Sequence, residues 1–192
     1  MNLQSAIQPI IETTAIITTI ALALRGYTIS RRNELELTRR RERLEHINRS
    51  LNDFYGPLYV LSEVGQRAYS AFLHKMGGEG FFEESPMKED RLNEWFIWVE
   101  EIFIPLNQIR EDLIIQNAHL IREEEFPESM LIFITHAALY KAMLAKWKQN
   151  DHQEYLPAID YPVELGEYTR KSYRELKHEQ LGLIGKTEKT VL

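Results

Sequence analysis

Residues 44–61 read LEHINRSLNDFYGPLYVL, and their apolar side chains recur with the period of a heptad. The first heptad position holds leucines seven residues apart and extends upstream of this stretch: Leu37, Leu44, Leu51 and Leu58. The second position, three residues later, holds Ile47, Phe54 and Leu61, with Arg40 as its one polar member. Such a seam is typical of a coiled coil or a bundle helix, and it packs against a helix of the same chain or of a second copy.

Gly56-Pro57 interrupts this seam. Proline removes one helical hydrogen bond and its ring presses on the preceding turn, which predicts a kink. Because the seam keeps its phase on both sides of Pro57, we expect a bent helix rather than a chain reversal. Its second arm is expected to end near Met76.

Further helices are expected downstream, separated by segments rich in Gly, Pro or acidic residues. The pattern predicts a surface loop over 77–87 and a helix over 88–122 that kinks or restarts at Pro105. Two more helices are predicted over 128–147 and over 161–184. No run of alternating apolar and polar residues longer than four occurs, so no sheet is expected.

The most apolar downstream stretch, 130–145, has two interpretations. It is a second membrane span or a central bundle helix. It is short for a span and contains His136 and Lys141, which favours the bundle helix.

Residues 7–24 read IQPIIETTAIITTIALAL and contain no Lys or Arg, which predicts a transmembrane helix. Residues 25–49 carry eight arginines, so the positive-inside rule places the N-terminus outside and the rest of the chain in the cytoplasm. One alternative is a cleaved signal peptide, because Ala21-Leu22-Ala23 resembles a cleavage site, but the basic n-region is missing. Another is a buried helix of a soluble protein.

The predicted fold is therefore all-α, with one N-terminal transmembrane helix followed by a cytoplasmic bundle of four to five helices. We expect a membrane anchor over 1–29 and a basic juxtamembrane helix over 30–50. The bundle follows over 51–184, and a flexible tail over 185–192.

Two polar features of the anchor region are candidate sites. Glu12 is a carboxylate within the predicted span, and it either carries protons or pairs with another subunit, or snorkels to the nearby interface. Five arginines are candidate contacts for anionic lipid headgroups: Arg31, Arg32, Arg39, Arg40 and Arg41.

The helix over 88–122 is apolar around most of its circumference near its start, which indicates a central position or an interface. Trp95, Trp98 and Phe103 are therefore candidate interface residues. We expect Trp98 to lie at the centre of the bundle and Trp95 to be the side chain that contacts a partner.

Several short motifs resemble a group of small bacterial membrane-anchored helical proteins with a Phe-Tyr-Gly-Pro-Leu motif. They are Leu51-Asn52-Asp53-Phe54-Tyr55-Gly56-Pro57-Leu58-Tyr59, Glu94-Trp95-Phe96-Ile97-Trp98, Pro105-Leu106-Asn107, His136, Tyr140, Trp147 and Leu176-Lys177-His178-Glu179-Gln180. The likeness covers most of the chain from Leu35 onward. It implies a protein of the bacterial cytoplasmic membrane, and it implies no activity.

The sequence contains no motif for several common catalytic and binding chemistries. There is no Cys, no nucleophile elbow and no phosphate-binding loop, so no catalytic or cofactor-binding residue is predicted. A metal site is not predicted either, because Glu175-x-x-His178 is a lone half-motif and nothing completes the pair of His119 and Glu123. His136 is expected to be a buried, hydrogen-bonded core histidine.

Charge argues against nucleic acid as a partner. Residues 25–49 carry eight arginines against four glutamates, a net charge of +4, whereas the whole chain carries −6. The rest of the chain is thus strongly acidic, which disfavours nucleic-acid binding.

The leading hypothesis is a non-enzymatic scaffold, accessory subunit or regulator that binds membrane lipids and other membrane or cytoplasmic proteins. A homo-oligomer is left open. The first alternative is an oligomerising membrane effector or sensor that acts through its Thr-rich span, and the second is an enzyme with a site inside the bundle.

Overall fold

The computed structural model describes the backbone of residues 3–83 and 87–188, and the side chains of 19–78, 80–83 and 87–185. The described backbone consists of helices, turns and connecting segments without a strand, so the prediction of an all-α fold is confirmed there. The chain divides into two compact units, Met1–His46 and Ile47–Leu192.

The first unit belongs to helix α1 (Leu3–Arg49). Its described side chains, from 19 to 46, are exposed apart from Arg40 and Leu44, which are half-buried. Local contacts hold this helix together: Arg40 pairs with Glu36 one turn away at 2.5 Å, and the Thr28 hydroxyl donates to the Arg25 carbonyl at 2.9 Å.

Among the residues whose side chains are described, no helix combines the length and the apolar character that a membrane span requires. Residues 7–18, which make up most of the predicted transmembrane helix over 7–24 and include Glu12, are not among the residues whose side chains are described. The transmembrane segment therefore stays a prediction.

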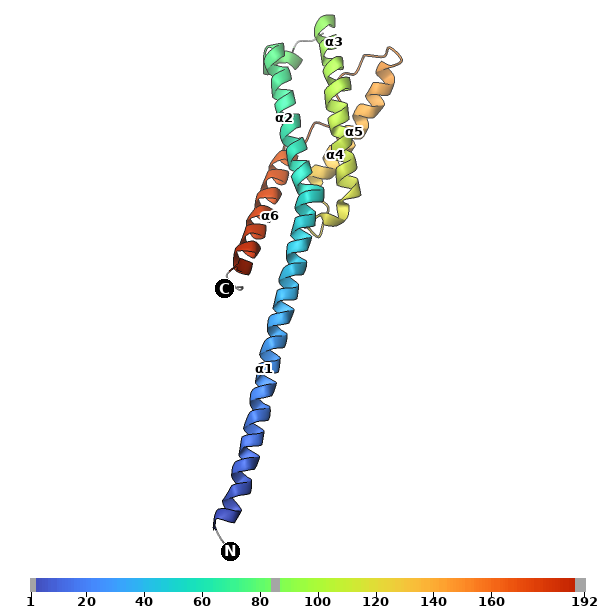
Figure 1. The fold of residues 1–192 in the computed structure, drawn as a ribbon. Helices are drawn as coiled ribbons and strands as arrows, with labels where there is room; N and C mark the ends of the chain where they lie inside the picture. The colour runs from blue at the N-terminus through green and yellow to red at the C-terminus, as the bar shows by residue number, and fades with distance from the viewer. Residues whose placement is uncertain (1–2, 84–86, 189–192) are drawn as a thin grey trace. The chain divides into compact units, whose positions relative to one another are not determined.

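The second unit is a helical bundle (Figure 1). A π-helical turn, Ser50–Tyr55, leads into α2 (Gly56–Met76). Next come α3 (Glu89–Trp98), a second π-helical turn (Val99–Phe103) and α4 (Ile104–Gln116). The last two helices are α5 (Glu128–Trp147) and α6 (Glu164–Glu188), and short 3-10 turns occur at Glu79–Phe82 and Ala118–Leu120.

The helices α2, α4, α5 and α6 of this unit each pack against two of the others. Helix α2 packs on α4 and α6, and α5 also packs on α4 and α6. Figure 1 shows the direction of the chain alternating from α2 to the α3–α4 pair, to α5 and to α6. This is the up-and-down arrangement of a four-helix bundle, with α3 and α4 sharing one position.

Both π-helical turns immediately precede a proline-containing helix start. The Gly56 amide donates to the Leu51 carbonyl five residues back, and the Ile104 amide donates to the Val99 carbonyl in the same way. Pro57 and Pro105 follow directly. Because proline lacks an N–H and crowds the turn before it, a locally wider turn lets the helix continue. The expected continuation of the helix through Pro57 is confirmed.

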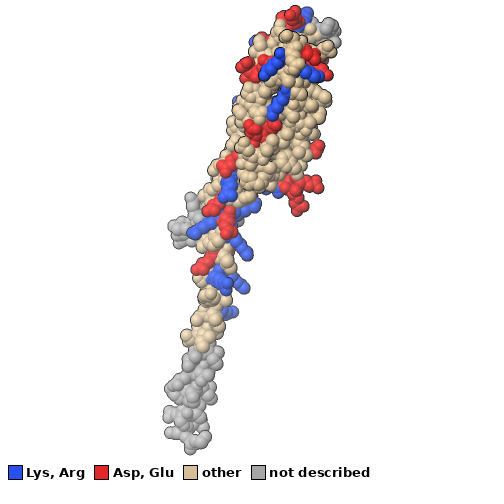
Figure 2. Space-filling model, turned by 90° about the vertical axis from the view of Figure 1, so that its right-hand side faces the viewer, with Lys and Arg blue, Asp and Glu red and all other residues tan. Residues whose placement is uncertain are grey.

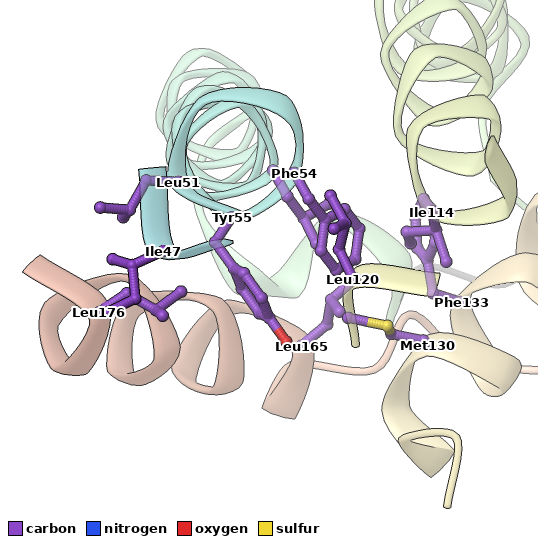
Figure 3. Packing of buried hydrophobic residues seen from close by; sticks show 11 residues of the cluster. Ile47, Leu51, Phe54, Tyr55, Ile114, Leu120, Met130, Phe133, Leu165 and Leu176 are labelled. Carbon is purple, nitrogen blue, oxygen red and sulfur yellow. The ribbon is translucent and has the colours of Figure 1, made fainter. Parts of the chain in front are cut away.

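The heptad seam builds the first apolar cluster of the bundle (Figure 3). Leu51 and Ile47 lie over α6 beside Leu176, and Phe54 points toward Leu120. Other buried members are Tyr55, Leu58, Ile114, Met130, Phe133 and Leu165. The seam is buried from Ile47 to Leu58. Leu44, which its place in the seam also predicts to be buried, is half-buried, so that prediction was wrong; Leu61 is half-buried too, and Leu37 is 38% exposed.

A second apolar cluster is aromatic: Phe72, Phe81, Trp95, Phe96, Val99, Tyr140, Met143 and Trp147. Phe81 is completely buried, so the prediction of a surface loop over 77–87 was wrong at this residue. Gly77 and Gly78 adopt φ of 95° and 99°, a left-handed conformation that glycine allows, and they end α2. The 3-10 turn that follows directs Phe81 back against Phe72, with ring centroids 4.9 Å apart.

Three helix boundaries differ from those predicted. Helix α4 ends at Gln116 rather than near Arg122, and α6 begins at Glu164 rather than at 161 and ends at Glu188 rather than at 184. The predicted central helix over 130–145 is confirmed as α5, whose buried side chains belong to both clusters.

Candidate functional site

Arg110 of α4 is the most unusual side chain of the bundle, because it is buried without a carboxylate. It is 3% exposed. Its Nε donates to the Leu106 carbonyl at 3.3 Å, Nη1 to the Tyr161 hydroxyl at 2.7 Å, and Nη2 to Asn107 Oδ1 at 2.5 Å. No aspartate or glutamate among the described side chains forms an ion pair with it. A buried charge stabilised by neutral acceptors alone is uncommon.

Aromatic rings and a glycine complete the surroundings of Arg110. The guanidinium carbon lies 4.8 Å from the ring centroid of Phe133 and 5.4 Å from that of Tyr161. A Cβ at Gly65 of α2 would lie 3.2 Å from Nη2, so the absence of a side chain there lets α2 approach the guanidinium. Burial lowers the pKa of Arg110 from its ordinary value, an effect that Tyr161 opposes. Arginine stays protonated in proteins, so the site is cationic.

His136 of α5 extends this polar group. It is 5% exposed, and its Nδ1–H donates to the Ile159 carbonyl at 2.7 Å, so the prediction of a hydrogen-bonded core histidine is confirmed. Its ring lies 5.7 Å from that of Tyr161. Burial lowers the pKa of His136, and the positive charge of Arg110 adds to this effect, whereas the hydrogen bond to Ile159 and the charge of Asp160 oppose it.

We call Asn107, Arg110, His136 and Tyr161 the polar layer. It joins α4, α5 and the connector between α5 and α6. Two open hollows mark the surface, one on α6 beside Arg170 and Arg174 and one on α2 beside Tyr59 and Glu63; neither is lined by a member of the layer. The arrangement is suited to fixing the connector against the helices, and we assign no reaction to it.

A second polar network ties the segment after α4 to α6. The Arg122 amide donates to the Tyr55 hydroxyl at 3.3 Å, Tyr55 donates to Tyr168 at 3.2 Å, and Tyr168 donates to Glu123 at 2.9 Å. Burial, the largest cause, raises the pKa of Tyr168, and Glu123 adds to the effect. Both hydroxyls therefore stay protonated and keep donating.

Neither network is predicted by the sequence pattern. Arg110 could have been noticed as a cation beside Ile109, Leu113 and Ile114, but an arginine in a helix is ordinarily solvated. Tyr161, 51 residues away, carries no local signal that it meets Arg110.

The structure reverses the roles expected for the two tryptophans. Trp95 is 3% exposed, and its Nε1 donates to the Tyr155 carbonyl at 2.8 Å, so the prediction that it contacts a partner was wrong. Trp98 is half-buried rather than central, and its Nε1 donates to Glu94 at 3.0 Å. Phe103 is half-buried and packs against both, with centroid distances of 5.8 and 6.1 Å. Trp98 and Phe103 thus remain candidates for an interface.

The candidate lipid contacts lie in the first unit. Arg31, Arg32, Arg39 and Arg41 are exposed, and Arg40 is half-buried in its pair with Glu36. The metal half-motifs are not brought together: Glu175 pairs with Arg122 at 3.1 Å, and no group of three or more His, Asp or Glu among the described residues is placed to hold a metal ion.

No family model, no curated protein and no solved structure matches this chain. The resemblance to small bacterial membrane-anchored helical proteins therefore stays a prediction.

Proposed function

We propose that this protein is a membrane-anchored scaffold, accessory subunit or regulator that binds other proteins at the cytoplasmic face, with no catalytic activity of its own. The observation that carries the proposal is the surface of α1 over residues 19–24. In this stretch Ile20, Leu22 and Leu24 are 54%, 64% and 60% exposed. Successive residues of a helix turn by about 100°, so these six positions cover the whole circumference.

A helix that is apolar on all sides is stable where the surroundings are also apolar. Moving a leucine or isoleucine side chain out of water is worth about 1.5–3 kcal/mol. Upstream to Ile7 the chain continues without Lys or Arg and is mostly apolar apart from Gln8, Glu12 and threonines, which favours a lipid bilayer as the surroundings. The arginines from Arg25 onward then favour a cytoplasmic location for the bundle.

Protein binding is supported by apolar side chains that the bundle leaves in solvent. Val60 and Val64 of α2 are 56% and 45% exposed, and Ile109 and Ile115 of α4 are 53% and 56% exposed. The polar layer fixes α4, and α2 packs on α4 and α6, so the bundle presents both surfaces as one packed unit.

Fractionation of cells that produce the full chain tests the anchor. We expect the chain in the membrane fraction, and we expect the double variant Ile20→Arg/Leu22→Arg to be lost from it. Val163→Arg, which introduces an arginine at a 72% exposed position of the connector, is the control and should stay with the membrane. Equal distribution of all three forms would refute the anchor.

Two further measurements test orientation and partners. A reporter fused after Leu192 should be active only if it functions in the cytoplasm, and a signal from a periplasmic reporter would refute the orientation. Capture of the full chain in mild detergent, followed by mass spectrometry, should recover the same proteins with the wild type and with Val163→Arg.

A further inference from the structure

Part of the connector between α5 and α6 takes the place of a helix in the bundle. Helix α6 supplies Leu165 and Leu176 to the first apolar cluster, but no described residue of α6 belongs to the second, aromatic cluster. Tyr155 of the connector packs against that cluster instead. In Figure 1 the connector returns from the upper end of α5 to the start of α6, which lies near the middle of α2. We call residues 152–157 of the connector the strap.

Two buried indoles hold the strap. It makes no backbone–backbone hydrogen bond in the described structure, and most of its residues are exposed. Trp147 Nε1 donates to the Glu154 carbonyl and Trp95 Nε1 donates to the Tyr155 carbonyl, both at 2.8 Å. The two tryptophans are only 4% and 3% exposed. The strap is therefore recognised through two consecutive carbonyls of its backbone.

Other contacts of the strap lie at the surface. The rings of Phe96 and His152 have centroids 4.8 Å apart, and His152 is exposed. Glu154 pairs with Lys146 at 2.8 Å, but both side chains are half exposed or more, and such a pair contributes little. Figure 2, drawn from the side on which α5 lies in Figure 1, shows broad uncharged areas between the charged side chains of this unit. Ion pairs therefore do little to hold the strap.

Both ends of the strap continue into firmly held backbone. Upstream, the Asp151 amide closes the turn after α5 by donating to the Lys146 carbonyl at 3.1 Å. Downstream, the polar layer binds the Ile159 carbonyl and the Tyr161 hydroxyl, each at 2.7 Å. The strap is thus a weakly bound loop between two fixed points.

We propose that the strap detaches from the bundle as a unit between these fixed points and uncovers a groove lined by Trp95, Phe96 and Trp147. Such local opening is favoured where a segment has few buried contacts and gains backbone freedom on release. Water then reaches both indole N–H groups, so opening leaves neither donor buried without an acceptor. The groove offers two N–H donors among aromatic rings. It fits an extended stretch of backbone, and the strap is its occupant within the chain.

Hydrogen exchange of the indole N–H groups in the full chain, followed by NMR, tests this opening. Trp95 and Trp147 should have equal protection factors, because one event frees both donors. Their protection should be at least about tenfold weaker than that of the Tyr140 and Met143 amides in α5, which exchange only through larger unfolding. Unequal protection of the two indoles, or protection as strong as that of the α5 amides, would overturn the proposal.

Two variants weaken the strap from opposite sides. Trp147→Phe removes one donor but keeps an aromatic ring, and it should speed exchange of the Trp95 indole about three- to tenfold. Pro157→Gly frees the backbone of the open strap, and it should speed exchange of both indoles equally, by about two- to fivefold. Trp98→Phe is the matched control, because the Trp98 indole donates within α3, and it should leave both rates unchanged. Unchanged rates in both strap variants would contradict the proposal.

Cleavage of the full chain by a glutamate-specific protease gives an independent readout by fragment mass. The bond after Glu154 lies within the strap, so its cleavage follows the population of the open form. Trp147→Phe and Pro157→Gly should accelerate this cut by the same factors as the exchange. The cut after Glu124, in the exposed segment between α4 and α5, is the internal reference and should not change.

Equal acceleration of both cuts would show general unfolding, and no acceleration of the cut after Glu154 would show that the strap does not open by itself. Either result would overturn the proposal. The proposal does not depend on the membrane anchor, because every measurement reports on the bundle alone.

Discussion

The guanidinium of Arg110 donates a hydrogen bond of 2.7 Å to the hydroxyl of Tyr161, which lies 51 residues further along the chain. This bond connects α4 to the end of the connector that precedes α6. Since His136 holds the carbonyl of Ile159 two residues earlier, the connector is fixed at two adjacent points.

Replacing Tyr161 by phenylalanine should therefore destabilise the bundle. It leaves a buried, charged donor without its acceptor, which costs about 1–3 kcal/mol. Chemical denaturation of the full chain measures the loss. Tyr155→Phe is the matched control, because no hydrogen bond of the Tyr155 hydroxyl occurs in the described structure, and it should change the free energy of unfolding little. Equal effects of the two substitutions would contradict the role assigned to Tyr161.

Acidification should weaken the bundle through His136. Burial and Arg110 depress its pKa below the ordinary value of 6.5 in the folded state. The unfolded chain then binds the proton more readily, so the stabilising contribution is present above about pH 6.5 and is lost as the pH falls below it. Arg110 on α4 and Asp160 in the connector are the charged groups that affect His136, and burial raises the pKa of the neighbouring Tyr140 above its ordinary value.

The melting temperature of the full chain should fall between pH 7 and pH 5 by more than that of His136→Gln. A glutamine amide can still donate to the Ile159 carbonyl, but it does not titrate. Identical slopes for the two proteins would show that the acid sensitivity comes from other groups.

Gly56 should not tolerate a side chain. A Cβ there would overlap the carbonyl oxygen of Leu51, which accepts the bond that defines the first π-helical turn. We expect Gly56→Ala to cost about 1–3 kcal/mol, as overpacking does. Gly182→Ala in α6, where nothing lies within 4 Å of the new Cβ, should instead stabilise the helix by about 0.5–1 kcal/mol. Thermal unfolding that ranks the two variants in the opposite order would contradict this description of the turn.

Truncation of the two tryptophans should have unequal effects. Trp95→Ala removes a buried indole and its hydrogen bond to Tyr155, and it should cost about 3–5 kcal/mol. Trp98→Ala removes a half-buried side chain and should cost less. Denaturation followed by circular dichroism avoids the fluorescence change that the substitutions themselves cause. A larger loss for Trp98→Ala would restore the assignment made from the sequence.

Truncation of the heptad leucines should also destabilise the protein to unequal extents. Leu51 is 5% exposed and Leu37 is 38% exposed. Leu51→Ala should lower the free energy of unfolding by about 2–5 kcal/mol, and Leu37→Ala should change it by less than about 0.5 kcal/mol. An unchanged melting temperature for Leu51→Ala would mean that the seam is not a packing surface.

The helices and most of their ends could be predicted because helix signals are local. The heptad from Ile47 to Leu58 identified the buried face of the first helix, since a period near 3.5 residues keeps apolar side chains on one side. Pro57 marked the turn at which that helix widens, because proline acts on the turn immediately before it. The core position of His136 followed from its place in an apolar stretch of helix.

The tertiary structure alone decided which side chains meet. Trp95 and Trp98 lie one turn apart on one helix, and both rings lie close to Phe72. Trp95 is the buried one because Phe81 and the Tyr155 carbonyl, from other parts of the chain, also contact it. The extra width of the π-helical turn at 99–103 also shifts the faces downstream of it, which a uniform helical period does not anticipate. Arg110 could be buried only because Gly65, Phe133 and Tyr161 converge on it from three separate segments, and contacts between distant segments leave no periodic trace in the sequence.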